Sequence, residues 1–410
     1  MKRVLFVSYD GLTDPLGQSQ VIPYLAGLSK IGYEITILST EKPENFSRLK
    51  NQIEKILSEN NVRWVPVKYH KKPPILSSVF DVRNLMRKAK QLHAEKKFDI
   101  VHCRSYMAAM VGQMMKKKFG CKFLFDMRGF WADERVDGGL WNLSRPHYKM
   151  VFNYFKKKEK EFFQEADHII SLTQNGADEI HNWKNLIGQP LPITVIPCCC
   201  DMNLFDRKKV TEEKRIASRK KLSLTENDLV LSYVGSVGTW YLADKMVLFF
   251  QRLLLKKPNA KFLLITQEPP ELIYREAEKL QIPKDKFIIT KAQRAEVPEL
   301  ISLSTLAVFF IKNAFSKKAS SPVKQGEIMS MGIPLVCNAG IGDTDKIVND
   351  CAGGISIADL TAEGIDKALE NIDSVIKISP DKIRDGATKW FSLDEGIRRY
   401  EKVYAQLFSA

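Results

Sequence analysis

The sequence predicts an α/β protein of two Rossmann-like domains facing each other across a cleft. Three observations support this fold class. Short apolar runs alternate with helical patterns along the chain, as expected for repeated βα units. The chain has 410 residues, enough for two domains with cores of ordinary size. Residues 320–347 read as loop, helix, strand and loop, with polar groups at the helix start, where open α/β sheets bind anionic ligands.

The composition is that of a globular protein with an excess of positive charge. Hydrophobic residues make up 44% and charged residues 27%, and 63 basic against 48 acidic residues give a net charge of +15. This excess favours an anionic partner: nucleic acid, acidic lipid or a phosphorylated substrate. The first apolar run is only as long as a strand, so we expect neither a signal peptide nor a membrane-spanning helix.

Seven cysteines occur, three of them consecutive at 198–200. No pair has the spacing of a zinc site, and an odd number in a long chain argues against a disulfide framework. We therefore expect a protein of the reducing cytoplasm, with the consecutive cysteines packed in a linker rather than bound to a metal.

The first elements form a βαβ unit. We expect a buried strand at Val4–Ser8, a Gly- and Pro-containing loop at Asp10–Gln20, a helix at Val21–Ile31 and a strand at Glu34–Ser39. The glycines of the loop are too far apart for a dinucleotide fingerprint. Later strands are expected at Val62–Val67, Phe98–Cys103, Lys122–Phe125, Ala166–Leu172 and Ile193–Pro197, and helices at 44–60, Phe80–His93 and 147–165.

A dense polar run, Asp126–Arg135, directly follows the strand Lys122–Phe125. Enzymes of the α/β class place catalytic groups at such strand ends. Arg128 is suited to stabilise a departing phosphate, and Asp126 to orient a hydroxyl or accept its proton. We expect this loop to be exposed. The alternative is that its charged side chains only pair with one another.

The helix at 147–165 carries lysines and aromatic residues, and a second lysine run stands at Lys116–Lys118. A basic surface with aromatic side chains suits binding to the interface of an anionic bilayer. The alternative is an ordinary solvated face.

The second half repeats the βα pattern. Strands are expected at Leu229–Val234, Lys261–Thr266, Phe287–Thr290, Leu306–Ile311 and Ile333–Cys337, and helices at 211–228, Pro298–Leu303 and 390–408. In the segment at 320–347, Lys324 near a helix start suits a phosphate, and Glu327 suits a ribose diol. The alternative is a plain amphipathic helix with a solvated glutamate.

This ordered set of motifs resembles glycosyltransferase family 4, enzymes of the GT-B fold. Glu327, Met329–Gly332 and Pro334–Val336 match the family's donor-binding segment. Ala319 stands where the family commonly has a second glutamate, so the paired-glutamate motif is broken. The run Ser320–Lys324 is similar to a variant found in other members.

The resemblance implies roles for further residues. Glycine amides after the strand Leu229–Val234 would meet the donor phosphates, and Ser236 takes the position of a usual arginine, so the positive charge would come from Lys324, Arg294 or Lys291. The implied donor-binding residues are Gly235, Ser236, Gly238, Arg294, Ser320, Ser321, Lys324 and Glu327. The implied acceptor-side residues are Gly17, Gln18, His102 and Arg104; the alternatives there are a surface turn and a core histidine. Asp126 and Arg128, offered as catalytic, replace the family's strand-end histidine.

The resemblance also implies the reaction. A sugar would pass, with retention and without a metal or other cofactor, from a nucleotide diphosphate sugar to a saccharide or lipid-linked saccharide of a bacterial surface polymer. We expect an acceptor domain at 1–200 joined by the helix at 390–410, a donor domain at 206–388, and a place in the cytoplasm, on the inner face of the membrane. Alternatives are a GT-B nucleotide-sugar epimerase and a non-enzymatic protein that binds membranes or nucleic acid, although no nucleic-acid motif occurs.

Overall fold

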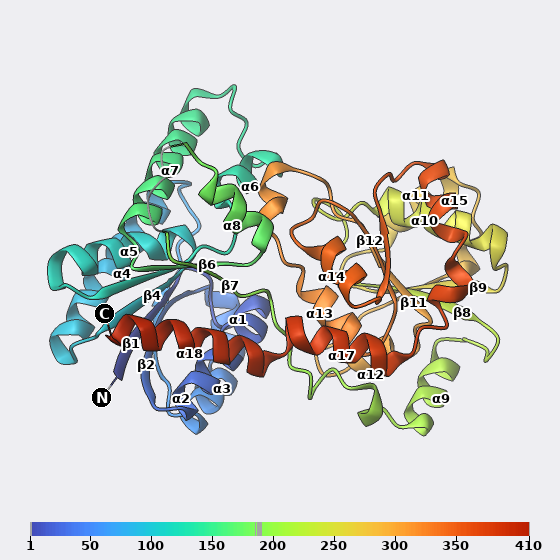
Figure 1. The fold of residues 1–410 in the computed structure, drawn as a ribbon, viewed down its shortest axis with the longest axis horizontal. Coiled ribbons are helices and arrows are strands. Elements are labelled where there is room, and N and C mark those ends of the chain that lie inside the picture. The colour runs from blue at the N-terminus through green and yellow to red at the C-terminus, as the bar shows by residue number, and fades with distance from the viewer. Residues whose placement is uncertain (1, 185, 187–190, 410) are drawn as a thin grey trace. The chain divides into compact units, whose positions relative to one another are not determined.

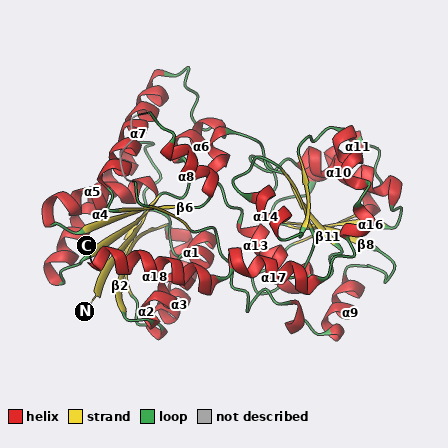
Figure 2. Cartoon of the chain, viewed as in Figure 1, coloured by secondary structure: helices red, strands yellow, loops and turns green. Residues whose placement is uncertain are grey.

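The computed structural model describes residues 2–184, 186 and 191–409. The chain divides into two compact units (Figures 1 and 2). Unit 1 comprises Met1–Pro197, Lys318–Ser320 and Leu393–Ala410, and unit 2 comprises Cys198–Lys317 and Ser321–Ser392. The segment Lys318–Ser320 belongs to unit 1. The sequence-based division assigned it to the second domain.

Unit 1 is built on a parallel sheet. Within the described residues it has seven strands in the order β3-β2-β1-β4-β5-β6-β7. Most of these strands are buried along nearly their whole length, as expected when helices cover both faces of a parallel sheet. The strands are β1 (Lys2–Ser8), β2 (Tyr33–Glu41), β3 (Arg63–Lys68), β4 (Ile100–Arg104), β5 (Lys122–Asp126), β6 (His168–Ser171) and β7 (Ile193–Val195).

Alternate residues of the central strands face two different helical layers. Leu5 and Val7 join the core under α4 and α5, while Phe6 and His102 face α18. The helices of unit 1 are α1 (Pro15–Gln20), α2 (Ile22–Lys30), α3 (Pro43–Glu59), α4 (Leu76–Glu95), α5 (Ser105–Phe119), α6 (Trp131–Asp137), α7 (Pro146–Glu165), α8 (Gln174–His181) and α18 (Leu393–Ser409).

Two of these helices lie where the sequence predicts loops. The second half of the Asp10–Gln20 loop forms α1, with Pro15 at its start, and part of the Asp126–Arg135 run belongs to α6. Proline at a first helical position is compatible with a helix, because the amide it lacks has no partner there in any case. The expectation of an exposed loop is wrong for Phe130, which is fully buried in the core of unit 1.

Unit 2 has a second parallel sheet, of six strands within the described residues, in the order β10-β9-β8-β11-β12-β13. Its one large core includes aromatic side chains from several strands and helices. The strands are β8 (Leu229–Val234), β9 (Ala260–Ile265), β10 (Phe287–Thr290), β11 (Leu306–Phe309), β12 (Leu335–Asn338) and β13 (Gly354–Ile357).

The helices of unit 2 fill the connections between these strands. They are α9 (Glu212–Lys221), α10 (Ala243–Lys256), α11 (Glu271–Lys279), α12 (Val297–Ile301), α13 (Val323–Ser330), α14 (Thr344–Asp350), α15 (Ala362–Leu369), α16 (Ile372–Val375) and α17 (Pro380–Phe391), with 3-10 turns at Arg207–Lys209, Lys284–Lys286 and Phe315–Ala319. The single helix predicted at 390–408 is divided at Ser392, where α17 ends and α18 of unit 1 begins. Among the described residues, no helix is both long and apolar enough to cross a membrane.

Candidate active site

The ammonium group of Lys324 is the most unusual charge in unit 2. Lys324 lies in the first turn of α13, is 8% exposed, and donates a hydrogen bond to the Tyr233 hydroxyl at 3.0 Å. Its Nζ lies 4.2 Å from the ring centre of Tyr233 and 3.5 Å from that of Tyr241. Burial lowers the pKa of Lys324 well below its usual value, and the Glu327 carboxylate opposes that shift. Aromatic rings thus stabilise a cation whose water has been removed.

Gly235 brings the backbone after β8 to this ammonium group. Its φ of +123° is a conformation that residues with a side chain rarely adopt. A side-chain carbon added at Gly235 would lie 2.7 Å from Lys324 Nζ. The Gly235 amide donates a hydrogen bond to the Ile265 carbonyl at 3.0 Å, and the absence of a side chain at Gly235 allows the Lys324 ammonium group to reach the loop after β8.

Glu327, one turn further along α13, is 7% exposed and accepts a hydrogen bond from Arg294 Nη1 at 2.9 Å. Burial raises the pKa of Glu327, against the opposing effects of Arg294 and Lys324. The Arg294 guanidinium also lies 5.4 Å from the ring centre of Phe205. The carboxylate is therefore held in one orientation from α13, and the solvated glutamate of the plain-helix alternative is not observed.

The remaining donor candidates fall in different surroundings. Ser236 accepts a hydrogen bond from the Tyr233 hydroxyl through its backbone carbonyl, and Gly238 has a φ of +96° in the same loop. The Ser321 hydroxyl accepts a hydrogen bond from the Cys198 amide at 3.1 Å, within unit 2. Ser320 belongs to the segment Lys318–Ser320 of unit 1. The structure thus gathers Gly235, Lys324, Glu327 and Arg294 near the start of α13, and gives Ser321 a structural contact.

Unit 2 also contains functional candidates that the sequence did not indicate. Tyr233 and Tyr241 hold the Lys324 ammonium, and Lys317 Nζ lies 3.6 Å from the ring centre of Trp240. The sequence pattern of a tyrosine in or beside a strand indicates only an ordinary core residue. No signal in the sequence connects them with a lysine some 90 positions later.

In unit 1, His102 lies in the middle of β4 and Asp126 at the carboxyl end of β5, and the two residues are 2% and 1% exposed. His102 Nδ1 lies 2.8 Å from the Tyr404 hydroxyl, and its Nε2 is 3.6 Å from Asp126 Oδ2. Tyr400 donates a hydrogen bond to Asp126 Oδ2 at 3.1 Å. The core-histidine alternative therefore describes the surroundings of His102 well.

The charge of Asp126 is fixed by its neighbours. Burial alone raises the pKa of Asp126, but Arg128, His102 and Arg104 together lower it below its usual value. Burial lowers the pKa of His102 and keeps the imidazole neutral near pH 7. A carboxylate that is ionised, buried and already bonded is a weak base for a hydroxyl proton. This geometry favours an orienting role for Asp126.

Arg128 and Arg104 bring two guanidinium groups to the same strand ends. Arg128 Nη1 lies 3.8 Å from Asp126 Oδ1, and the Arg128 backbone has a φ of +60°. Arg104 is 4% exposed and ends β4, paired in register with Asp126 of β5. Sequence pattern alone gave no reason to expect the Arg104 side chain to be buried.

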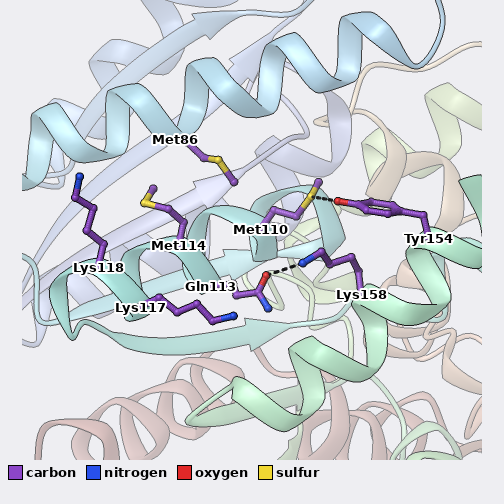
Figure 3. A pocket seen from close by; sticks show the side chains of 8 residues that line it. All are labelled: Met86, Met110, Gln113, Met114, Lys117, Lys118, Tyr154 and Lys158. Atoms are coloured by element: carbon purple, nitrogen blue, oxygen red, sulfur yellow. Dashed lines mark hydrogen bonds between the residues drawn. The ribbon is translucent and has the colours of Figure 1, made fainter.

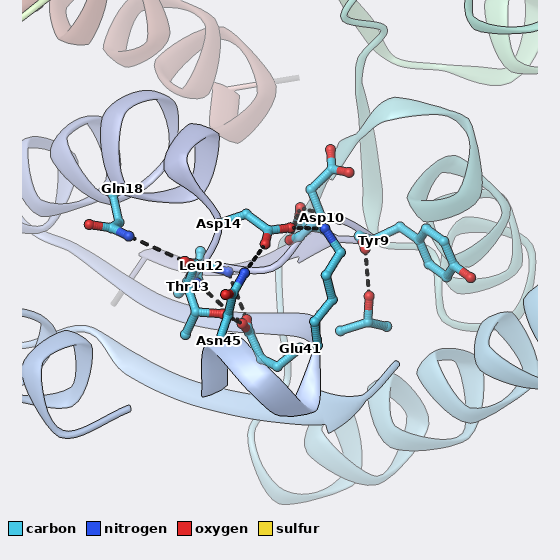
Figure 4. Close-up of polar contacts among 11 residues, drawn as sticks. Tyr9, Asp10, Leu12, Thr13, Asp14, Gln18, Glu41 and Asn45 are labelled. Atoms are coloured by element: carbon cyan, nitrogen blue, oxygen red, sulfur yellow. Dashed lines mark hydrogen bonds and ion pairs between the residues drawn. The ribbon is translucent and has the colours of Figure 1, made fainter. Parts of the chain in front are cut away.

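The loop after β1 is held by a glutamate that the sequence did not single out (Figure 4). The buried Glu41 carboxylate accepts hydrogen bonds from the Leu12 amide at 2.7 Å and from the Thr13 amide and hydroxyl at 3.2 and 2.6 Å. Gly17 packs against the backbone of this loop, and Gln18 donates a hydrogen bond to the Thr13 carbonyl at 3.2 Å. These two of the predicted acceptor-side residues thus lie in α1 and are packed against or bonded to the fixed loop before it.

A hollow of about 590 Å³ opens between α4, α5 and α7 on unit 1 (Figure 3). Its floor is apolar, and lysines stand at its rim. The residues lining it are Met86, Met110, Gln113, Met114, Lys117, Lys118, Tyr154 and Lys158. Among the residues that the structure describes, no group of three or more His, Cys, Asp or Glu side chains is arranged to hold a metal ion.

Two protein-family models match consecutive parts of the chain. The model described as Glycosyltransferase Family 4 matches residues 18–204, and the model described as Glycosyl transferases group 1 matches residues 214–390. A D-inositol 3-phosphate glycosyltransferase from Actinosynnema mirum is 21% identical over 178 residues, which is 43% of this chain. The match spans 40% of that relative's length.

Solved structures with the same architecture cover the whole chain. Sucrose-phosphate synthase from Thermosynechococcus elongatus has a TM-score of 0.75 at 14% identity, with 100% of both chains covered. HepE from Anabaena, solved in complex with UDP-glucose, has a TM-score of 0.69 at 13% identity and covers 99% of this chain and 100% of its own. Because the two matched models together span most of the sequence, the chain belongs to glycosyltransferase family 4 and has the GT-B fold.

Proposed function

We propose that the protein transfers a hexose from a nucleotide diphosphate sugar to a hydroxyl group of a saccharide or lipid-linked saccharide. Transfer would proceed with retention at the anomeric carbon and without a metal ion. The observation that carries the proposal is the buried Lys324 ammonium beside Gly235 at the start of α13. A cation held apart from water at the start of a helix fits a diphosphate.

The neighbouring groups of unit 2 supply the other contacts that such a donor needs. The Lys324 ammonium group would meet the diphosphate beside the loop after β8, and the Glu327 carboxylate would accept hydrogen bonds from the ribose diol. Arg294 holds Glu327 in place and adds a second cation. A UDP-sugar is our first choice of donor, because the related HepE structure contains UDP-glucose.

Retention without a dedicated nucleophile agrees with the chemistry of these side chains. Asp126 is buried and hydrogen-bonded, so we assign it an orienting role rather than attack on the sugar. The leaving phosphate would then take the proton of the incoming hydroxyl on the same face of the sugar. Catalysis would rest on positioning and on cations that stabilise the departing diphosphate.

We further propose that the protein works on a bacterial surface polysaccharide at the inner face of an anionic membrane. Helices α4, α5 and α7 carry twelve Lys and Arg residues against five Asp and Glu. Between them lies the methionine-lined hollow, with Lys117, Lys118 and Lys158 at its rim (Figure 3). Basic side chains around an apolar hollow complement an anionic phospholipid. The lysines would contact the lipid phosphate, and the hollow would hold an acyl chain.

The first test is thermal stabilisation by UDP, GDP, ADP, CMP and their sugars in the presence of EDTA. A ligand that binds the native state raises the melting temperature once its concentration exceeds its dissociation constant. We expect one base to give a clear shift that survives EDTA. A shift that EDTA abolishes would contradict metal independence, and no shift with any nucleotide would contradict donor binding. An isomerised sugar formed without an acceptor would identify an epimerase instead.

A further inference from the structure

Arg104 is a buried cation without a partner. It is 4% exposed, and its Nε is buried without a hydrogen bond. Within the described part of the chain, no residue forms a hydrogen bond or an ion pair with its side chain. Taking a guanidinium group out of water without a compensating anion is strongly unfavourable, so such a group calls for an explanation.

The nearest charges increase this imbalance. Burial lowers the pKa of Arg104, and the Arg128 guanidinium lowers it further; Asp126, Asp10 and Tyr400 act in the opposite direction. The Asp126 carboxylate already receives the Tyr400 hydrogen bond and faces Arg128. Asp10 is exposed, so water screens its charge. The Asp126 carboxylate is therefore shared with other groups and does not form an ion pair or a hydrogen bond with Arg104.

The start of α5 adds to this positive potential. The helix has 15 residues, begins directly after Arg104, and its first turn receives no side-chain cap. Its free amides and the positive end of its dipole therefore point at the same strand ends. Arg104 itself pairs with Ser8 of β1 and Asp126 of β5, which places it in the middle of the carboxyl edge of the sheet. Open parallel sheets bind their ligands at this edge.

Backbone strain marks the same place. Ser105, directly after Arg104, has a φ of +68°, and Arg128 has a φ of +60°. Residues with a side chain seldom adopt this conformation, and where they do, function is a common reason. The two strained residues follow neighbouring strands, so the strain belongs to one site.

We propose that Arg104, Arg128 and the first turn of α5 bind a phosphate or diphosphate group of the acceptor. A multiply charged phosphate matches two guanidinium groups and a helix start better than a single carboxylate does. The acceptor would then be a phosphorylated compound, such as a saccharide linked to a lipid through a diphosphate. The role of this site in sugar transfer rests on the proposed function. Binding of the anion itself does not depend on that function.

The first experiment measures binding of inorganic pyrophosphate by calorimetry, in a Lys324→Ala background that disables the proposed phosphate contact of unit 2. We compare Arg104→Gln with Arg48→Gln, an exposed arginine on α3. Loss of a charged hydrogen-bond donor should weaken binding on the order of tenfold or more in Arg104→Gln alone. Equal affinity in both variants would overturn the proposal. Arg104-dependent binding of glucuronate as tight as that of pyrophosphate would overturn the assignment to phosphate.

The second experiment uses stability without ligand. Because Arg104 has no partner, Arg104→Met should keep or raise the melting temperature relative to Arg48→Met. A clear fall would mean that Arg104 serves the fold and would overturn the binding role. Arg104-dependent pyrophosphate binding in a protein without transferase activity would refute the proposed function alone. If Arg104→Gln retains the wild-type KM for a phosphorylated acceptor in the transfer reaction, the phosphate-binding role of Arg104 is refuted, while the proposed transferase function stands.

Discussion

Lys324 shows how a charge can be kept inside a protein without an acid in contact with it. Its Nζ lies against the faces of Tyr233 and Tyr241 and donates to the Tyr233 hydroxyl. These contacts compensate only in part for lost hydration, so the pKa of Lys324 falls. A bound diphosphate would complete the compensation, and the affinity for the donor should therefore depend on pH.

We predict that affinity for a nucleoside diphosphate decreases as the pH rises through the lowered pKa of Lys324. The protonated ammonium attracts the diphosphate, and deprotonation removes that attraction, so binding takes up a proton when the free group is partly neutral. Titration calorimetry with UDP between about pH 6 and 9, in buffers of different ionisation enthalpy, measures this proton uptake. Lys324→Met should bind more weakly and without the pH dependence. A wild-type affinity that is constant over this range would contradict the prediction.

We also predict that Glu327→Ala weakens donor binding about tenfold or more, because a charged acceptor for the ribose hydroxyls is lost and Arg294 is left unpaired. The measurement is the dissociation constant for the nucleotide that stabilises the wild type best. Glu363→Ala, an exposed glutamate at the start of α15, is the matched control. If both variants keep the wild-type affinity, Glu327 does not touch the donor.

At the scale of elements, α18 closes one side of the sheet of unit 1. Its Tyr400 hydroxyl reaches Asp126 at the end of β5, and its Tyr404 hydroxyl reaches His102 in the middle of β4. The other ring nitrogen of His102, Nε2, lies 3.6 Å from Asp126 Oδ2. The last helix of the chain therefore satisfies polar groups at the edge where unit 1 is expected to bind its ligand.

Removal of one of these hydroxyls should have a measurable cost. We predict that Tyr404→Phe destabilises the protein by about 1–3 kcal/mol, because His102 Nδ1 is left buried without a partner. Tyr33→Phe is a suitable control: its ring packs against Tyr404, and its hydroxyl has no hydrogen bond within the described residues. Urea unfolding of both variants with unchanged m-values gives the difference. Equal stabilities would show that water replaces the Tyr404 hydroxyl.

At the scale of the whole molecule, the positive charge is unevenly distributed. The net charge is +15, and the excess of seven basic residues on α4, α5 and α7 accounts for nearly half of it. Several of these lysines pair with glutamates on α7, for example Lys158 with Glu161 and Lys117 with Glu165. The excess nevertheless leaves a basic field around the methionine-lined hollow, and such a field attracts anionic surfaces.

We predict that the protein sediments with vesicles containing phosphatidylglycerol and not with pure phosphatidylcholine vesicles at physiological salt. Replacing Lys117, Lys118 and Lys158 by Gln should reduce the vesicle affinity tenfold or more, since each basic residue near the surface contributes about 1 kcal/mol. A triple Gln variant of Lys214, Lys220 and Lys221 on α9 changes the net charge equally and serves as control. An equal loss in both variants would show that only net charge matters.

The sequence by itself determined the class of fold and most of the elements. Apolar runs and helical spacing placed the strands of both sheets within a few residues, except β13, because local periodicity reflects which face of an element is buried. The order of motifs around Glu327 also identified the family, which both family models confirm. The missed elements include β13, α14, α15 and α16, and also α1 and α6, which are short and begin within or directly after Gly- and Pro-containing segments typical of loops.

The tertiary structure alone decided the surroundings of the charged groups. It buried Phe130 and Asp126 where an exposed loop was expected, placed two tyrosines against Lys324, and left the buried Arg104 Nε without a hydrogen bond. The physical reason is that these contacts join residues far apart in the sequence: His102 and Tyr404 are separated by 302 positions. Strand order and helix packing, rather than local sequence pattern, determine which charged side chains lie close together. Their proximity sets the pKa values of these side chains and determines which polar groups can still bind a ligand.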